Sequence, residues 1–236
     1  MNISNNRVKP LTIVFCLPGK QFSNNFLLCW TELLQYCFSN NIRAIISNRT
    51  NSNVYYVRNQ CLGGNVQDGI YQKPFSNKVD YDYIMWIDSD QVFKVEDFIK
   101  LLEAKKDIVS GLYLMDRGRM FSTVEKWDRD FYKKNGYFEF LTPEYVRKWR
   151  TENKNKLMEV EYCGFGWILI KKGVFEKLEY PWFRPIWEDF GKTKNGDDIK
   201  EFTSEDVGFC QSILKKGFKI HVDTSIVVGH EKTCIY

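Results

Sequence analysis

The sequence lacks most of the features that mark whole classes of proteins. Among its 236 residues are only 2 histidines and 6 prolines. It has no run of about eighteen apolar residues, which excludes a predicted transmembrane helix. It has no internal repeat and no low-complexity segment, which excludes a solenoid or a disordered chain. A globular chain remains, because 44% of the residues are hydrophobic and 16% are aromatic.

Neither sign of charge is in large excess. The 34 basic and 30 acidic residues give a formal net charge of +4, and the lysines are spread along the chain. So small an excess does not favour a nucleic-acid partner. It does suit an anionic small ligand such as a phosphate.

The cysteines form no CxxC pair, and their number, 7, is odd. Most of them lie in apolar surroundings, so we expect buried, reduced thiols and neither a disulfide framework nor a zinc site. They are Cys16, Cys29, Cys37, Cys61, Cys163, Cys210 and Cys234. The polar stretch 1–9 lacks the apolar segment of a signal peptide. We therefore expect a cytoplasmic protein, bacterial or, if its source is a virus, in the host cytoplasm.

Short apolar runs alternate with segments of helical period in the first half of the chain. The expected strands cover residues 11–17, 42–46, 83–87 and 107–114. The expected helices cover residues 23–38, 54–62 and 95–102. This alternation predicts an α/β fold with a mostly parallel, Rossmann-like central sheet flanked by helices.

The alternation stops at residues 116–160, which are rich in charge and aromatic rings. We expect an insertion or flap there, with a helix that begins at Thr142 and Pro143. The elements expected after it are a turn and strand over 161–170, a helix over 172–178, a loop over 180–198, a helix capped by Thr203 or Ser204, and strands over 218–222 and 225–228. We treat 1–236 as one domain, with halves 10–115 and 161–236 on either side of the insertion.

Asp88 and Asp90 directly follow the apolar run 83–87. Alternate residues of an extended chain point to the same side, so both carboxylates face one spot. Ligands of open α/β sheets bind at the carboxyl ends of the strands. The pair therefore predicts a site for a divalent cation and a phosphate. From this stretch alone, a plain polar turn remains an equal interpretation.

Three later features complete a pattern. A Gly-x-Gly turn, Gly164-Phe165-Gly166-Trp167, precedes a strand, Glu205-Asp206 opens a helix, and His230 closes a late strand. In this order and spacing, with Asp88-Ser89-Asp90 as the DxD motif, the chain resembles the GT-A fold of nucleotide-sugar-dependent glycosyltransferases. The resemblance covers about residues 11–230 and is weakest at 116–159.

The resemblance implies a single GT-A domain with a nucleotide-sugar-binding half, an acceptor-binding and catalytic half, and a smaller antiparallel part near the acceptor. It implies Mn²⁺ or Mg²⁺ held by Asp88, Asp90 and His230. It implies Asp206 as the catalytic base, with Glu205 beside it. The implied nucleotide-sugar site comprises Leu17, Pro18, Gly19, Arg58, Asp88, Ser89, Gly164, Gly166 and Trp167.

The implied reaction moves a sugar from a nucleotide diphosphate sugar, a UDP- or GDP-sugar foremost, to a hydroxyl of a glycan or related acceptor. A cation neutralises the charge that grows on the leaving diphosphate, and a carboxylate takes the acceptor proton. The Glu205-Asp206 pair favours inversion, although the DxD motif and His230 also fit retention. Trp167, Trp182 and Trp187 are candidate platforms for sugar rings.

Each of these residues also has a structural interpretation. Acids in a first helical turn serve the helix dipole, and tryptophans are more often core residues than ligand platforms. Two other functions stay open. One is a sugar nucleotidyltransferase, for which Pro18-Gly19-Lys20 is a short phosphate loop. The other is a non-catalytic carbohydrate- or nucleotide-binding module. The turn at Gly164 and Gly166 lacks the third glycine of a dinucleotide fingerprint.

Overall fold

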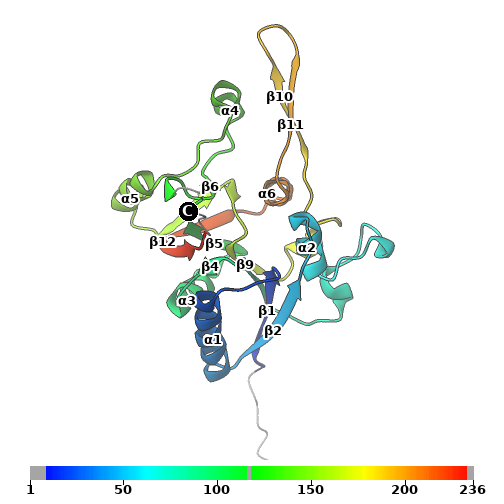
Figure 1. Ribbon diagram of the computed structural model, residues 1–236, viewed down its shortest axis with the longest axis vertical. Helices are drawn as coiled ribbons and strands as arrows, with labels where there is room; N and C mark the ends of the chain where they lie inside the picture. Colours follow the sequence, from blue (N-terminus) through cyan, green and yellow to red (C-terminus); the bar gives the residue numbers. More distant parts are fainter. Residues whose placement is uncertain (1–8, 116–117, 233–236) are drawn as a thin grey trace, which may run out of the picture.

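A central sheet runs through the computed structural model, which describes residues 9–115 and 118–232 (Figure 1). The strands of this sheet are β1 (Leu11–Pro18), β2 (Ile42–Arg49), β3 (Tyr83–Ile87), β4 (Gln91–Val92), β5 (Ile108–Tyr113), β7 (Leu157–Val160), β9 (Trp167–Lys171) and β12 (Ile220–His230). Their order is β2-β1-β3-β9-β5-β12-β4, and β7 also pairs with β12. The polar stretch 1–8, Asp116 and Cys234 lie outside the described residues.

Most of the long strands run in one direction. β1, β2 and β3 are mutually parallel, and so are β5 and β12. β9 lies between β3 and β5 and runs antiparallel to both. The expected α/β class, a mostly parallel sheet flanked by helices with a smaller antiparallel part, is confirmed.

Helices cover both faces of the sheet. They are α1 (Asn24–Ser39), α2 (Val54–Cys61), α3 (Val95–Glu103), α4 (Arg129–Asn135), α5 (Pro143–Glu152) and α6 (Glu205–Lys215). Ile13 and Phe15 of β1 face the core under α1 and α3, whereas Val14 and Cys16 face the core under α2 and α6. Successive strand residues point to opposite faces, so β1 is apolar on both sides.

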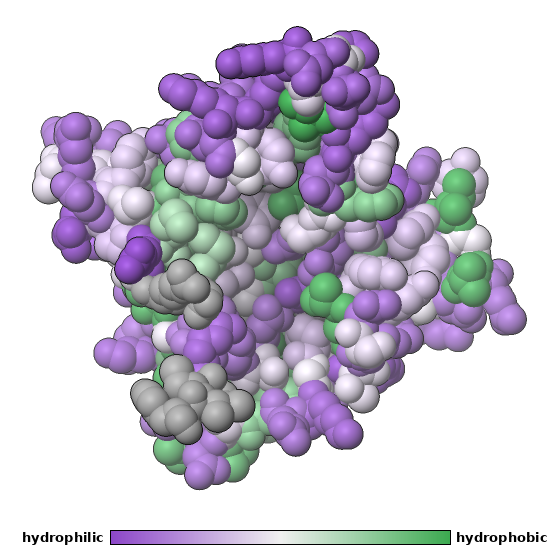
Figure 2. All heavy atoms as spheres, turned by 45° about the horizontal axis from the view of Figure 1, so that its top comes forward, coloured by the Kyte–Doolittle hydropathy of each residue, from purple (hydrophilic) through white to green (hydrophobic). Residues whose placement is uncertain are grey.

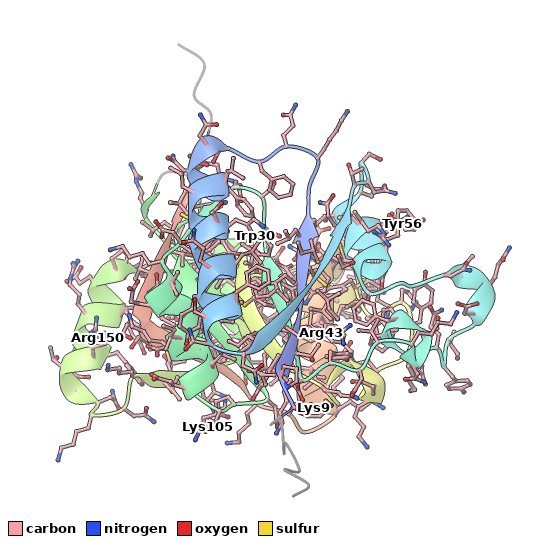
Figure 3. The ribbon with its side chains drawn as sticks, turned by 90° about the horizontal axis from the view of Figure 1, so that it is seen from below. Lys9, Trp30, Arg43, Tyr56, Lys105 and Arg150 are labelled. Atoms are coloured by element: carbon pink, nitrogen blue, oxygen red, sulfur yellow. The ribbon has the colours of Figure 1, made fainter. Side chains whose placement is uncertain are left out.

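Figure 3 shows α1 and α2 on opposite sides of β1 and β2, with Trp30 directed from α1 toward the sheet and Tyr56 on the outer side of α2. Trp30 packs edge-on against Phe15, with the ring centroids 5.2 Å apart. The helix predicted over 23–38 is confirmed, and Ser23 caps it by accepting a hydrogen bond from the amide of Phe26. This packing holds α1 against the middle of β1.

The predicted loop over 180–198 is wrong. β10 (Trp187–Lys192) and β11 (Asp198–Phe202) form an antiparallel hairpin that projects from the domain at the top of Figure 1. Figure 2 shows hydrophilic atoms over this end of the molecule and hydrophobic atoms below them. The hairpin was not predictable from apolar runs, because most of its side chains are exposed.

Two further elements differ from the sequence-based expectation. The helix predicted over 172–178 is a single 3-10 turn, Phe175–Lys177. The strands predicted over 218–222 and 225–228 form one strand, β12, with a register irregularity between Val222 and Val227. Asp223 causes the interruption in the apolar pattern, because its carboxylate accepts hydrogen bonds from the amide and hydroxyl of Ser225 inside the strand.

The insertion forms a helical arm beside the hairpin. The predicted helix start is confirmed, since Thr142 caps α5 by accepting from the Tyr145 amide. Two short strands, β6 (Thr123–Val124) and β8 (Tyr162–Cys163), tie the ends of the arm together. α4 lies against β10, with the ring of Tyr132 stacked on Phe190 at 4.1 Å.

The six described cysteines are free thiols, as expected, and five of them are buried. Within residues 9–115 and 118–232, none of the helices has the length and apolar character needed to cross a membrane.

Candidate functional site

Arg58 lies at the centre of a charged cluster at the carboxyl end of β3. Its Nε donates to the carboxylate of Glu205 and its Nη2 donates to Asp88, both at 3.1 Å. The guanidinium also lies over the rings of Trp86 and Phe165, at 5.6 and 5.3 Å from the centroids. Arg58 is 4% exposed, so it is a buried ion-pair residue and not a solvated helix residue.

The pKa values in this cluster reflect burial and shared charge. Desolvation acts against the charged form of Arg58, yet Asp88 and Glu205 hold its pKa above the ordinary value. Desolvation raises the pKa of Asp88, which Arg58 partly offsets. Desolvation and the neighbouring carboxylate of Asp206 raise the pKa of Glu205. A buried cation with two carboxylates is held in place by the cost of leaving any member unpaired.

Asp90 is held by residues at and just after the end of β12. β12 pairs with β4 so that His230 stands opposite Gln91, next to Asp90. His230 Nε2 lies 3.0 Å from the Asp90 carboxylate, and Lys232 Nζ lies 2.9 Å from it. Although desolvation opposes them, these two groups hold the pKa of Asp90 well below its usual range. The hydrogen bond to Asp90 raises the pKa of His230.

The donor atoms fit a divalent cation in part. His230 Nδ1 lies 2.7 Å from the carbonyl oxygen of Leu114, an arrangement that orients Nε2 as a ligand. Asp90 Oδ2 and His230 Nε2 are 3.0 Å apart, as are neighbouring ligands of an octahedral ion at about 2.1 Å each. However, the described residues contain no group of three or more His, Cys, Asp or Glu side chains arranged to hold a metal. Asp88 is instead paired with Arg58.

A hollow of about 370 Å³ opens beside this cluster, at the carboxyl ends of β1 and β3. We call it the rim hollow. It is lined by Pro18, Gly19, Lys20, Thr50, Asn51, Ser52, Val54, Val57, Arg58, Asp88, Ser89 and Asp90. Gly19 lies so close to Ser89 that a Cβ on Gly19 would be 2.7 Å from the Ser89 Cβ. The loop after β1 and the DxD motif therefore form one continuous wall.

Asp206 lies next to Glu205 but has different partners. The hydroxyls of Tyr162 and Ser204 both donate to its carboxylate, the first at 2.9 Å. Burial and the charge of Asp206 raise the pKa of Tyr162 well above its ordinary value, so the hydroxyl remains a donor. Asp206 is partly exposed, and its side chain is not one of those that pair with Arg58.

The Gly164–Gly166 turn supports the site through its backbone. The amide of Asp88 donates to the carbonyl of Gly166 at 3.1 Å. A Cβ on Gly164 would overlap the hydroxyl of Tyr113, and a Cβ on Gly166 would lie 2.8 Å from Gln91 Nε2. Both glycines are thus needed for close packing behind the DxD motif.

Four predicted nucleotide-sugar residues do not line the rim hollow, namely Leu17, Gly164, Gly166 and Trp167. Trp167 is fully buried and packs on Phe93 at 4.5 Å, because β9 is apolar on both faces. Leu17 is 5% exposed, and its carbonyl accepts from the side chain of Asn48. Trp182, a candidate platform for sugar rings, is also a core residue at 2% exposure. Trp187 is exposed on the hairpin.

Sequence reasoning missed several residues that shape the site. Tyr162 and Ser204 position Asp206, Lys232 neutralises Asp90, and Tyr113 supports the glycine turn. The position of Ser204 at the helix cap was a signal, since it lies two residues before Asp206. Tyr162 had no comparable signal, because its partner is 44 residues away.

No protein-family description matches this sequence, and no curated protein matches it either. Solved structures do match. A197 from STIV aligns with a TM-score of 0.53 at 19% identity, over 94% of this chain and 86% of its own. GalNAc-T7, crystallised with UDP, GalNAc and Mn²⁺, aligns at 0.49 and 13% identity, over 95% of this chain and 43% of its own. The inositol-1-phosphate CTP transferase from T. maritima aligns at 0.42 and 8% identity, over 96% and 91%. Among these neighbours, the likeness to A197 is the one that shows a shared fold, and it extends over nearly the whole chain.

Proposed function

We propose that this protein is a metal-assisted glycosyltransferase that moves a sugar from a nucleotide diphosphate sugar to a hydroxyl acceptor. One observation carries the proposal. The rim hollow is lined by a buried arginine and the two DxD carboxylates, and this arginine pairs with Glu205 at the start of the helix that bears Asp206. Such convergence at the carboxyl ends of parallel strands is typical of a ligand site in an α/β sheet.

In this proposal the rim hollow binds the donor. The nucleotide lies along the wall of Pro18, Gly19 and the 50–52 loop, and its diphosphate lies near Asp90. Asp90 and His230 would hold a Mn²⁺ or Mg²⁺ ion, whereas Asp88 stays paired with Arg58. The ion would neutralise the charge that forms on the leaving diphosphate.

Asp206 acts as the general base for the acceptor hydroxyl. Two hydroxyl donors, Tyr162 and Ser204, orient its carboxylate. A base on the acceptor side of the donor sugar gives inversion at the anomeric carbon. Glu205 is not free for this task, because it pairs with Arg58. It acts as a positioning residue that fixes the start of α6.

The test is turnover of a panel of UDP-, GDP-, dTDP- and CDP-sugars, with mixed saccharides as acceptors, in Mn²⁺ and in EDTA. The proposal predicts release of one nucleoside diphosphate that requires Mn²⁺. A sugar nucleotidyltransferase would instead release pyrophosphate from a nucleoside triphosphate and a sugar phosphate. A binding module would bind a nucleotide or a saccharide and release neither product. Either of these results would contradict the proposal.

A further inference from the structure

A second hollow, of about 200 Å³, lies at the start of α6, where Ser204 and Val207 line it. Its walls are mostly aromatic, so we call it the aromatic hollow. The rings that line it include Trp127, Tyr132, Phe138, Phe140, Tyr162 and Phe202. They come from three separate parts of the chain: the insertion, β8 and the end of β11.

The walls are held in place by ring packing. Trp127 stacks on Phe138 with centroids 3.5 Å apart, and Tyr132 stacks on Phe190 at 4.1 Å. An ion pair between Arg129 and the buried Glu188 also joins the insertion to the hairpin, at 2.8 Å. The walls of the aromatic hollow are therefore preformed, and a ligand that binds there loses little free energy in ordering side chains.

The aromatic hollow adjoins the proposed catalytic base. Tyr162 and Ser204 line it, and both donate hydrogen bonds to the carboxylate of Asp206. The neighbouring Glu205 pairs with Arg58, which lines the rim hollow. The start of α6 thus lies between the two hollows. Glu205 contacts a residue that lines the rim hollow, and Asp206 contacts residues that line the aromatic hollow.

We propose that the aromatic hollow is the acceptor subsite and that it binds one sugar ring of a glycan acceptor. This inference rests on the proposed function. A pyranose ring has a face of C–H groups, which suits the negative face of an aromatic ring. Its edge carries hydroxyls, and the hollow offers the polar groups of Glu201, Thr203 and Ser204 at its border.

The chemistry of the walls favours a sugar over other hydroxyl acceptors. A serine or threonine of a peptide has no flat apolar face, so it would leave the rings uncovered. A lipid chain would shield the carboxylate and hydroxyls of the border from water and offer them no hydrogen bond in exchange. The indole N–H of Trp127 is buried and has no hydrogen-bond partner among the described residues. A sugar hydroxyl can supply that partner after a small shift of the ring.

The test uses the full chain labelled with 5-fluorotryptophan and followed by ¹⁹F NMR. Trp127 reports on the aromatic hollow, and Trp86, under the guanidinium of Arg58, reports on the rim hollow. Trp127→Phe and Trp86→Phe assign the two resonances. The probes are methyl glycosides of glucose, galactose, mannose, N-acetylglucosamine, rhamnose and fucose, each alone and with UDP, GDP, dTDP or CDP and Mn²⁺.

We expect at least one glycoside to shift the Trp127 resonance. Phe202→Ala should weaken that binding about tenfold, the loss of roughly one ring contact. Phe202 is 63% exposed, so the substitution leaves the fold intact. Tyr137→Ala is the matched control, because Tyr137 is 52% exposed and is not among the residues that line the hollow. It should bind like the wild type.

The two reporters separate failure of the inference from failure of the proposed function. If no glycoside shifts Trp127, or if Phe202→Ala binds as tightly as the wild type, the acceptor subsite is wrong. If UDP, GDP, dTDP and CDP all leave Trp86 unshifted in the presence of Mn²⁺, the proposed donor site is wrong. A Trp127 shift with no Trp86 shift would leave a sugar-binding protein without the proposed transfer.

Discussion

The rim hollow and the aromatic hollow are built by different means. Charges at strand ends make the first, and they lie in short motifs such as Asp88-Ser89-Asp90. Rings from segments far apart in the sequence make the second. A charge that follows an apolar run is conspicuous, whereas a ring in a hollow resembles a ring in the core. A functional residue can thus be recognised in the sequence when its charge opposes burial. It cannot be recognised when its side chain is as apolar as those of the core.

The largest expected effect on stability is at Arg58. Arg58→Met leaves the buried Glu205 and the partly exposed Asp88 without their shared cation. We expect a loss of about 3–5 kcal/mol in the free energy of unfolding, measured by urea denaturation. Arg43→Met is the control, since Arg43 is exposed on β2 and should change stability by less than about 0.5 kcal/mol. Equal effects of the two variants would show that the buried cluster does not support the rim hollow.

Asp206→Asn should separate chemistry from folding. The amide oxygen can still accept from Tyr162 or Ser204, but it cannot take a proton. We expect turnover of the donor to fall about 100-fold or more, with nucleotide affinity unchanged. Asp130→Asn, in the exposed first turn of α4, should keep full turnover. Normal turnover in Asp206→Asn would contradict the proposed role of Asp206 as general base.

Gly164→Ala tests the backbone support of the DxD motif. The added Cβ would overlap the Tyr113 hydroxyl and lie 2.5 Å from the Ser122 hydroxyl oxygen. Because both neighbours are buried, we expect a loss of about 1–3 kcal/mol in stability. Thermal unfolding would measure it. An unchanged melting temperature would mean that this turn has more room than the structure shows.

The smallest expected effect on stability is at the edge of the aromatic hollow. Phe202→Ala should change the free energy of unfolding by about 0.5 kcal/mol or less, because most of the ring is exposed. Urea denaturation of Phe202→Ala and Arg58→Met under the same conditions would compare the two losses of stability directly. A loss as large as that of Arg58→Met would show that the hairpin rings are structural, like the rings of the core.

Much of the fold was predictable because local patterns and tertiary structure agree. The apolar runs of β1 and β3 are buried on both sides, and the acids at the start of α6 follow its cap at Ser204. The hairpin was missed because β10 and β11 expose most of their residues. Such a strand is stabilised by its hydrogen bonds to the neighbouring strand and not by burial of an apolar face, so its sequence shows no apolar pattern.

The sequence predicted which residues form the site better than it predicted which of them pair with one another. Asp88, Asp90 and Arg58 line one hollow, but nothing local indicates that Arg58 pairs with Glu205, 147 residues further along the chain. Burial of Trp167 was equally hidden, since a tryptophan serves as core or as platform with the same side chain. Only the packing of β9 between β3 and β5 decides between these roles.

The most direct test of the central claim is a thermal-shift measurement with UDP, GDP, dTDP and CDP, each with Mn²⁺ or EDTA. A ligand that binds the folded state at about a hundred times its dissociation constant adds roughly 2.7 kcal/mol of stability. We predict that one nucleotide raises the melting temperature in Mn²⁺, that EDTA or Asp90→Ala abolishes the rise, and that Asp107→Ala, at an exposed carboxylate outside the rim hollow, keeps it. No rise with any nucleotide, or an equal rise in Asp90→Ala, would contradict a donor site at this rim.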